Sequence, residues 1–139
     1  MAGEVFVDTS GWCALLDRRE SRHERAREIL RQLLAEGRTL VTSDYVIDET
    51  CTLTRARAGG DASVRFLRLI ENTAALRIEW VGSERFAATK AFFVKHADQQ
   101  YSFTDCASFL LMRESNISEA LTSDSHFHSA GFVALLSDG

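Results

Sequence analysis

Short apolar segments alternate with longer amphipathic segments along nearly the whole chain, and this alternation constrains the fold more than any other feature. Each short segment has the length and the apolar content of a buried strand, and a helix-start signal follows most of them within a few residues. Repeated alternation with short links favours a parallel sheet that helices cover on both faces. We expect strands at residues 4–8, 39–42, 76–81, 120–122 and 132–136.

The segments between these strands carry apolar residues at helical spacing. In the clearest one, apolar residues follow Phe103 at the i+3, i+4, i+7 and i+8 positions. A serine or aspartate that can cap the first turn stands at most of the expected starts, and Gly37 and Gly59-Gly60 mark stops. We expect helices over residues 10–16 (capped by Ser10), 21–36 (opened by Ser21), 44–58 (capped by Ser43 or Asp44) and 83–95 (begun by Ser83), with two more that begin at Asp61 and Ser102.

Four acidic residues stand near the ends of these elements. Asp8 ends the first strand segment, Asp124 follows the fourth in the same form, Asp105 lies in the first turn of a helix, and Glu49 lies in helix 44–58. If the first and fourth strands are parallel neighbours, their acids emerge at the carboxyl edge of the sheet, where open α/β folds bind ligands. Carboxylates gathered there repel one another, and a hard divalent cation relieves the repulsion. The four acids therefore suggest a single metal site.

Each acid also has a purely structural explanation. Asp105 stands three residues after Ser102, so the pair could form a capping box. Asp8 could be a turn residue at a strand end, and Asp124 could cap the short turn 125–128. Glu49 could lie on an exposed helix face, where its neighbour Asp48 competes for any role. Taken together these explanations weaken, because one topology can send all four acids to the same edge.

The size and composition fit a compact enzyme. The 139 residues are close to the commonest domain size, so we expect a single domain over residues 1–139. No apolar run approaches the length of a membrane span, and the N-terminus lacks a signal-peptide pattern. The three cysteines are widely spaced and include no C-x-x-C pair, which favours reduced thiols in a cytoplasmic protein.

The charge distribution says more about partners than the net charge does. A net charge of −4 argues weakly against a general electrostatic nucleic-acid binder. Between Arg18 and Arg31, however, six arginines face three glutamates. Such a charge-mixed helix is most often simply a solvated face. The alternative is that some of these arginines meet phosphates.

Four segments, in this order and spacing, resemble the successive motifs of PIN-domain ribonucleases, and the resemblance covers essentially the whole chain. It is closest to the single-domain VapC-type group, which includes toxins of toxin–antitoxin pairs. The segment Thr52-Leu53-Thr54-Arg55-Ala56-Arg57 after the second motif adds to it. The four motifs are Phe6-Val7-Asp8-Thr9-Ser10, Tyr45-Val46-Ile47-Asp48-Glu49-Thr50, Ser102-Phe103-Thr104-Asp105-Cys106 and Leu121-Thr122-Ser123-Asp124-Ser125-His126-Phe127.

The resemblance implies a three-layer α/β/α fold with a five-stranded parallel sheet and Mg²⁺- or Mn²⁺-dependent cleavage of RNA. Asp8 and Asp105 would be the main direct metal ligands, and Glu49 and Asp124 would complete the shell directly or through water. Thr9 and Thr104 fall beside them and would orient carboxylates. Asp98 is a possible auxiliary acid, whereas His126 and His128 are left out because histidine is a poorer ligand than oxygen for Mg²⁺.

The resemblance also implies partners. We expect single-stranded RNA as substrate, a small antitoxin that blocks the site, and a homodimer formed through helical faces of residues 44–72. The residues expected to meet RNA phosphates are Arg18, Arg19, Arg22 and Arg25.

Three alternatives remain at this point. The chain could be a catalytically silent PIN domain that only binds RNA or protein, although acids at all four positions count against this. It could also be a housekeeping RNA-processing nuclease. A receiver-like or haloacid-dehalogenase-like phosphotransfer protein is disfavoured, because Asp8 is not followed by the second acid of an Asp-x-Asp pattern.

Overall fold

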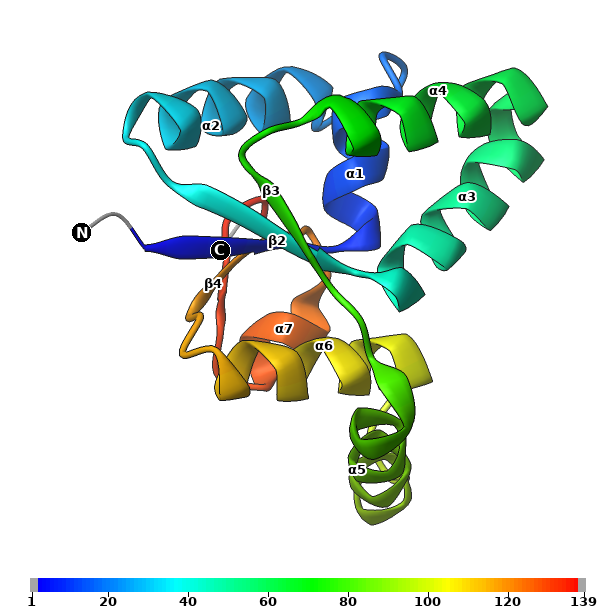
Figure 1. The fold of residues 1–139 in the computed structure, drawn as a ribbon, viewed down its shortest axis with the longest axis vertical. Coiled ribbons are helices and arrows are strands. Elements are labelled where there is room, and N and C mark those ends of the chain that lie inside the picture. The colour runs from blue at the N-terminus through cyan, green and yellow to red at the C-terminus, as the bar shows by residue number, and fades with distance from the viewer. Residues whose placement is uncertain (1–2, 138–139) are drawn as a thin grey trace.

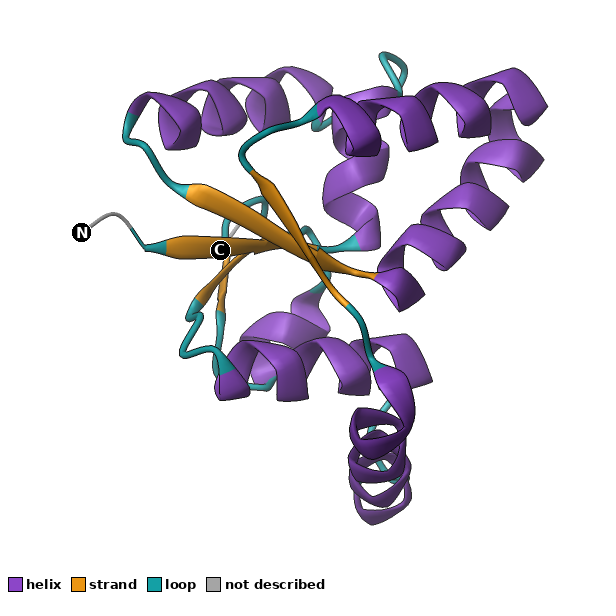
Figure 2. Cartoon of the chain, viewed as in Figure 1, coloured by secondary structure: helices purple, strands orange, loops and turns teal. Residues whose placement is uncertain are grey.

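The computed structural model describes residues 3–137, which form a central parallel sheet between two layers of helices (Figures 1 and 2). The sheet has five strands in the order β3-β2-β1-β4-β5, and every neighbouring pair is parallel. This confirms the expected three-layer fold with a five-stranded sheet. The strands are β1 (Glu4–Val7), β2 (Thr39–Ser43), β3 (Leu76–Glu79), β4 (Glu119–Leu121) and β5 (Val133–Ala134).

The helices divide between the two faces of the sheet (Figure 1). One layer holds α1 (Thr9–Leu16), α2 (His23–Ala35), α3 (Asp44–Ala58) and α4 (Gly60–Asn72). The other layer holds α5 (Gly82–Lys95), α6 (Phe103–Glu114) and α7 (Ser125–Ser129). None of the helices within residues 3–137 combines the length and the apolar character that crossing a membrane requires.

The middle strand explains why the first apolar segment shows no alternation. Val5, Phe6 and Val7 are completely buried, because helices cover β1 on both faces. On one face Trp12 meets Phe66 edge-on, with ring centroids 5.5 Å apart. On the other face Phe109 packs against several aromatic rings. The core therefore holds β1, and with it the start of α1, at the centre of the molecule.

Several expected helix starts are wrong by one or two residues. The N-terminal cap residues are Asp8 for α1, Arg22 for α2 and Val81 for α5, and none of them makes a side-chain capping bond. The helix expected from Asp61 begins at Gly60. The caps expected at Ser10, Ser21 and Ser83 are thus incorrect. Ser43 and Ser102, by contrast, do cap α3 and α6 with their side chains.

All five strands also differ from their expected bounds. The second runs one residue longer, to Ser43, and the fourth is Glu119–Leu121 rather than 120–122. The first strand stops at Val7, because Asp8 already begins the turn into α1. The third stops at Glu79 rather than at residue 81. The last was expected over residues 132–136 but is only Val133–Ala134, because the chain turns at Leu135 while its backbone still bonds to β4. None of these differences moves the carboxyl edge of the sheet.

The approach of α1 to the end of β4 is too close for any side chain. A Cβ atom added to Gly11 would lie 2.1 Å from the carbonyl oxygen of Leu121. Glycine is therefore required at this position. The contact brings the residues after β1 and those after β4 side by side, as the expected site requires.

Candidate active site

The four acids come from four different elements and line one cavity. Asp8 follows β1 and Asp124 follows β4, its neighbour in the sheet, so both leave the same carboxyl edge. Glu49 lies in the second turn of α3, and Asp105 lies in the first turn of α6. All four line a cavity of about 340 Å³. The edge lies where the strand order reverses direction beside β1, the usual ligand site of open α/β sheets.

Hydroxyl groups from two strand ends hold Asp8 in place. The Thr122 hydroxyl donates to Asp8 Oδ2 at 3.0 Å, and the Ser10 hydroxyl lies 3.4 Å from the same oxygen. Ser10 and Thr122 also bond to each other at 2.9 Å. In turn, Ser10 Oγ accepts from the backbone of Ser123, and Thr122 Oγ1 accepts from that of Asp124. This network fixes the first carboxylate relative to the backbone that carries the fourth.

Burial makes the ionised form of Asp8 unfavourable. The residue is 4% exposed, and burial raises the pKa of its carboxyl from the ordinary 3.8 to about 7. The value of about 7 already includes the negative charges of Asp105 and Asp124, which also raise the pKa, and the hydrogen bonds from the backbone of Thr9 and from Thr122, which lower it. The desolvation and the like charges outweigh the hydrogen bonds. A cation bound beside Asp8 would favour its ionised form.

Asp105 serves the helix and the cavity at once. Its Oδ2 accepts from the backbone of Ser102 at 3.0 Å, and the Ser102 hydroxyl accepts from the backbone of Asp105 at 2.9 Å, which makes the capping box. Burial raises the pKa of this carboxyl, and the charge of Asp124 adds to the effect. The backbone bond from Ser102 and the contact with His126 lower the pKa in part. The capping box and the place in the cavity are thus compatible.

Asp124, like Asp105, both caps a helix and lines the cavity. Its Oδ1 accepts from the backbone of His126 at 2.9 Å and so caps α7. Within residues 3–137 the other oxygens, Asp105 Oδ1 and Asp124 Oδ2, accept no hydrogen bond. Each of these two acids therefore ties one oxygen to the protein and leaves one for a ligand.

His126 lies against the acids, although ligand preference had excluded it from the site. Its Nδ1 is 3.2 Å from Asp105 Oδ2 and 3.3 Å from Asp124 Oδ1. The potential ligand atoms of these three residues all lie within 4.8 Å of one another. Tyr101 meets the imidazole edge-on and holds its ring. His128, also excluded, is exposed and lines a separate hollow at β5.

Sequence reasoning missed two further charged residues of the cavity, Arg57 and Glu20. Arg57 could have been found, because Glu49, Leu53 and Arg57 follow i, i+4, i+8 spacing and all line the cavity from α3. Glu20 lies in the turn after α1, where no periodicity applies. Arg57 brings the cavity a positive charge that can meet a phosphate.

The remaining candidates divide clearly. Thr9 lines the cavity, and its buried hydroxyl oxygen has no hydrogen-bond partner among residues 3–137. Thr104 is half-buried on α6 but is not among the lining residues. Asp48 and Asp98 are both exposed and do not line the cavity either. Between Asp48 and its neighbour Glu49, the geometry therefore selects Glu49.

The four arginines expected to bind RNA lie outside the acidic cavity of the described chain. Arg19 bonds to Asp17 through Nε at 3.1 Å and lines a neighbouring cavity. Arg22 donates to the carbonyl of Leu136 near the end of the chain. Arg18 and Arg25 are exposed. Their contact with RNA stays a prediction.

The donor set suits a hard divalent cation. Carboxylate oxygens dominate the cavity, two of them are free, and the buried hydroxyl of Thr9 lacks a partner. A divalent cation would offset the like charges that raise the pKa values of Asp8 and Asp105. Such a site can bind a phosphate through the ion and activate a water molecule beside it.

Known proteins share this sequence pattern and this fold. Residues 5–133 match the PIN domain family. The chain is 35% identical over 129 residues to the 23S rRNA-specific endonuclease VapC20 of Mycobacterium tuberculosis strains CDC 1551 / Oshkosh and ATCC 25618 / H37Rv, with 93% of this chain and 95% of that protein covered. It is also similar to the crystal structure of Mycobacterium tuberculosis VapC20, described as a sarcin-ricin loop cleaving toxin, with a TM-score of 0.81, 35% identity, and 93% and 96% of the two chains covered.

Proposed function

This chain belongs to the PIN-domain family, and on that premise we propose that it is a divalent-metal-dependent endoribonuclease that acts as the toxin of a toxin–antitoxin pair. The observation that carries the proposal is the convergence of Asp8, Glu49, Asp105 and Asp124 on one cavity. The relative VapC20 is an endonuclease specific for 23S rRNA. For this chain we propose single-stranded RNA as the substrate, and the proposal specifies no cleavage sequence.

In the proposed mechanism each side chain has a separate task. Asp8 and Asp105 would hold a Mg²⁺ or Mn²⁺ ion directly, and Glu49 and Asp124 would complete its shell directly or through water. When bound, the ion lowers the pKa of a coordinated water and polarises the scissile phosphate. The network of Ser10 and Thr122 positions the Asp8 carboxylate before the metal arrives.

Two further groups act on the substrate and on the acids. Arg57, at the edge of the cavity, meets a phosphate of the RNA. His126 contacts both Asp105 and Asp124 and keeps the two carboxylates oriented toward the cavity. The four arginines 18, 19, 22 and 25 would bind phosphates farther along the strand.

The first prediction concerns metal removal. We expect the purified protein to cleave an unstructured RNA oligonucleotide with millimolar Mg²⁺ or Mn²⁺ and to stop when EDTA is in excess, because the acids alone cannot activate water. Gel analysis of the end-labelled RNA measures the effect. Adding Mn²⁺ beyond the EDTA should restore the same product pattern, which shows that EDTA removed the metal and did not inactivate the protein irreversibly. Undiminished cleavage in EDTA would disprove the mechanism.

The second prediction concerns the antitoxin. A basic side chain in its C-terminal segment would be attracted to the same carboxylates that hold the metal. We therefore expect the product of a small gene beside this one to form a stable complex and to stop cleavage. Replacing the last arginines of that product with glutamine should weaken the inhibition, measured with the same RNA. Full inhibition by the substituted product would contradict this mode of binding.

A homodimer is part of the same proposal. On α4 the side chains of Val64, Leu67 and Leu69 are 45%, 41% and 41% exposed, within the 44–72 segment expected to pair. Light scattering should therefore give twice the mass of the chain. A monomeric mass would contradict the dimer but not the nuclease.

A further inference from the structure

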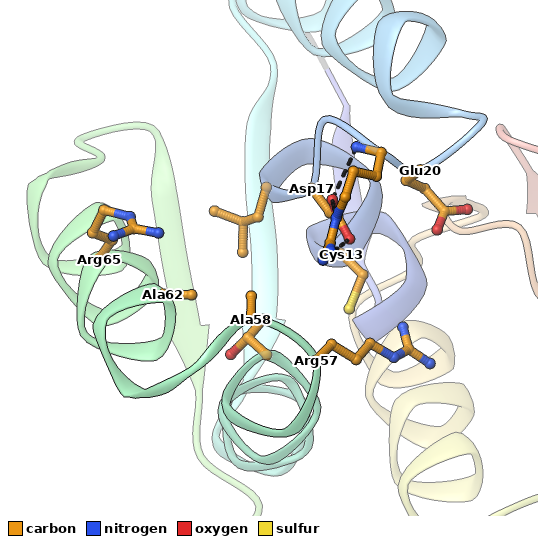
Figure 3. A pocket seen from close by; sticks show the side chains of 10 residues that line it. Cys13, Asp17, Glu20, Arg57, Ala58, Ala62 and Arg65 are labelled. Carbon is orange, nitrogen blue, oxygen red and sulfur yellow. Dashed lines mark hydrogen bonds and ion pairs between the residues drawn. The ribbon is translucent and has the colours of Figure 1, made fainter.

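A second cavity has a volume of about 350 Å³, and Figure 3 shows the side chains that line it. It adjoins the acidic cavity, because some residues line both. It lies among α1, the turn after it, α3 and α4. Its volume is within the range of roughly 300–1,000 Å³ that is usual for small-molecule sites. Of the residues that line it, the mechanism above uses only Arg19 and Arg57.

The two cavities share part of their walls. Cys13, Glu20 and Arg57 line both of them. Arg57 is close enough to Cys13 for its charge to lower the pKa of the thiol, against the larger effect of burial. A linear polymer bound at the four acidic residues can therefore extend past Arg57 into the second cavity.

The second cavity combines an apolar wall with positive charge. Leu16, Ala58 and Ala62 supply apolar surface. In Figure 3 the side chains of Ala62 and Ala58 lie between those of Arg65 and Arg57. Both arginines are exposed, and neither forms an ion pair within residues 3–137. Arg19, by contrast, already pairs with Asp17 on the same rim.

We propose that this second cavity binds one nucleotide of the RNA, next to the phosphate that is cleaved. The base packs against the wall of Leu16, Ala58 and Ala62, and Arg57 and Arg65 meet the phosphates on either side. A flat apolar base with anionic linkers matches this surface, whereas an acidic peptide would supply the charge without the flat apolar group. The inference rests on the proposed RNA substrate, but it concerns binding and not cleavage.

Two variants test the wall and the rim separately. Ala62→Phe fills the cavity, and Arg65→Gln removes one rim charge. Their matched controls are Ala88→Phe, at an exposed position of α5 outside both cavities, and Arg68→Gln, an exposed neighbour on α4 that does not line the cavity. Circular dichroism melts establish that each variant is folded.

The measurement is fluorescence anisotropy of a labelled six-nucleotide RNA in EDTA at low salt, where no cleavage occurs. We expect Ala62→Phe to weaken binding on the order of tenfold, and Arg65→Gln roughly three- to tenfold, with both controls within about twofold of wild type. A series of the same RNA, each member lacking one base, gives the decisive comparison. The RNA that lacks the base bound in the cavity should bind wild type more weakly than the intact RNA does. The Ala62→Phe variant should bind that RNA and the intact RNA equally, because its cavity is already filled.

The inference is wrong if wild type does not bind the RNA, if Ala62→Phe binds as wild type does, or if every abasic RNA affects both proteins equally. Its failure is distinct from failure of the nuclease proposal. A protein that binds with this base dependence but does not cut in Mn²⁺ would retain the nucleotide site and lose the proposed activity. A protein that cuts but shows no base dependence would do the reverse.

Discussion

Asp105→Asn is expected to lower the rate of RNA cleavage on the order of a thousandfold while leaving the metal-free protein as stable as wild type, or more so. An amide is a far poorer ligand for Mg²⁺ than a carboxylate, and a metal ion contributes several kcal/mol to such reactions. Single-turnover cleavage with saturating Mg²⁺ measures the rate. The stability of the metal-free protein is measured by thermal melting in EDTA.

The expected stability follows from the two tasks of Asp105. Its carboxylate accepts from the backbone of Ser102, and the amide oxygen of asparagine can accept the same bond. The substitution also removes a buried negative charge close to Asp124, which opposes the smaller loss at the helix dipole.

Asp105→Ala is the matched control for the capping box. It removes the metal ligand and the bond to Ser102 together, so it should lower stability by about 1 kcal/mol in addition to abolishing cleavage. An asparagine variant that still cuts RNA would remove Asp105 from the site. An asparagine variant as destabilised as the alanine variant would show that the negative charge of Asp105 stabilises the metal-free fold, which contradicts the expected result.

The fold was predictable because the buried strands of the sheet appear in the sequence as short apolar runs. Val5, Phe6 and Val7 read as an unbroken apolar run since β1 lies in the middle of the sheet. The helix starts were less predictable, because a serine can bond to its own helix or elsewhere. The Ser10 side chain bonds to Thr122, which is 112 positions away in the sequence. The local sequence pattern shows only that a serine stands near a helix start, so it predicts a cap.

The four acids were found for a reason that the structure makes clear. Asp8, Asp105 and Asp124 stand where an element begins, and the parallel order of β1 and β4 brings the ends that carry Asp8 and Asp124 together. Glu49 lies inside α3, in its second turn. The helix-capping roles that the sequence also suggested for Asp105 and Asp124 are both real. Asp105 and Asp124 each cap a helix with one oxygen, and both residues line the cavity. Local pattern alone cannot separate two tasks that one carboxylate performs together.

What the sequence did not show depends on contacts between distant elements. His126 reaches the acids because α7 turns its ring toward the first turn of α6, and a preference rule for metal ligands says nothing about such a contact. Glu20 enters the cavity from an irregular turn. Arg57, however, could have been found, because it lies eight residues after Glu49 in the expected helix 44–58 and so shares a face with it.

The largest effect on stability is expected for Asp8→Asn. Burial raises the pKa of Asp8 from 3.8 to about 7 in the folded protein, so the unfolded chain ionises first as the pH rises. Well below pH 3.8 the Asp8 carboxyl is protonated in the folded and in the unfolded protein, so its ionisation does not change the free energy of unfolding. Between about pH 4 and 7 the metal-free protein loses stability, and above that the loss is constant at about 4 kcal/mol.

Asparagine cannot ionise and removes this loss. The advantage of Asp8→Asn over wild type in EDTA should therefore increase by about 2–3 kcal/mol between pH 5 and pH 8. Urea unfolding at the two pH values, followed by circular dichroism, gives the free energies of unfolding. The difference between the two pH values cancels any constant effect of the amide on packing. Asp48→Asn, an exposed acid on α3, is the control and should show no such increase.

Mg²⁺ should reverse the comparison. Only a native state that binds the ion is stabilised by it, and wild type keeps the carboxylate that the ion needs. At pH 8 wild type should therefore gain more stability from millimolar Mg²⁺ than Asp8→Asn does. A stability difference in EDTA that is equal at pH 5 and pH 8 would show that the Asp8 carboxyl is not a buried charge. A variant that gains as much from Mg²⁺ as wild type would show that Asp8 is not a ligand.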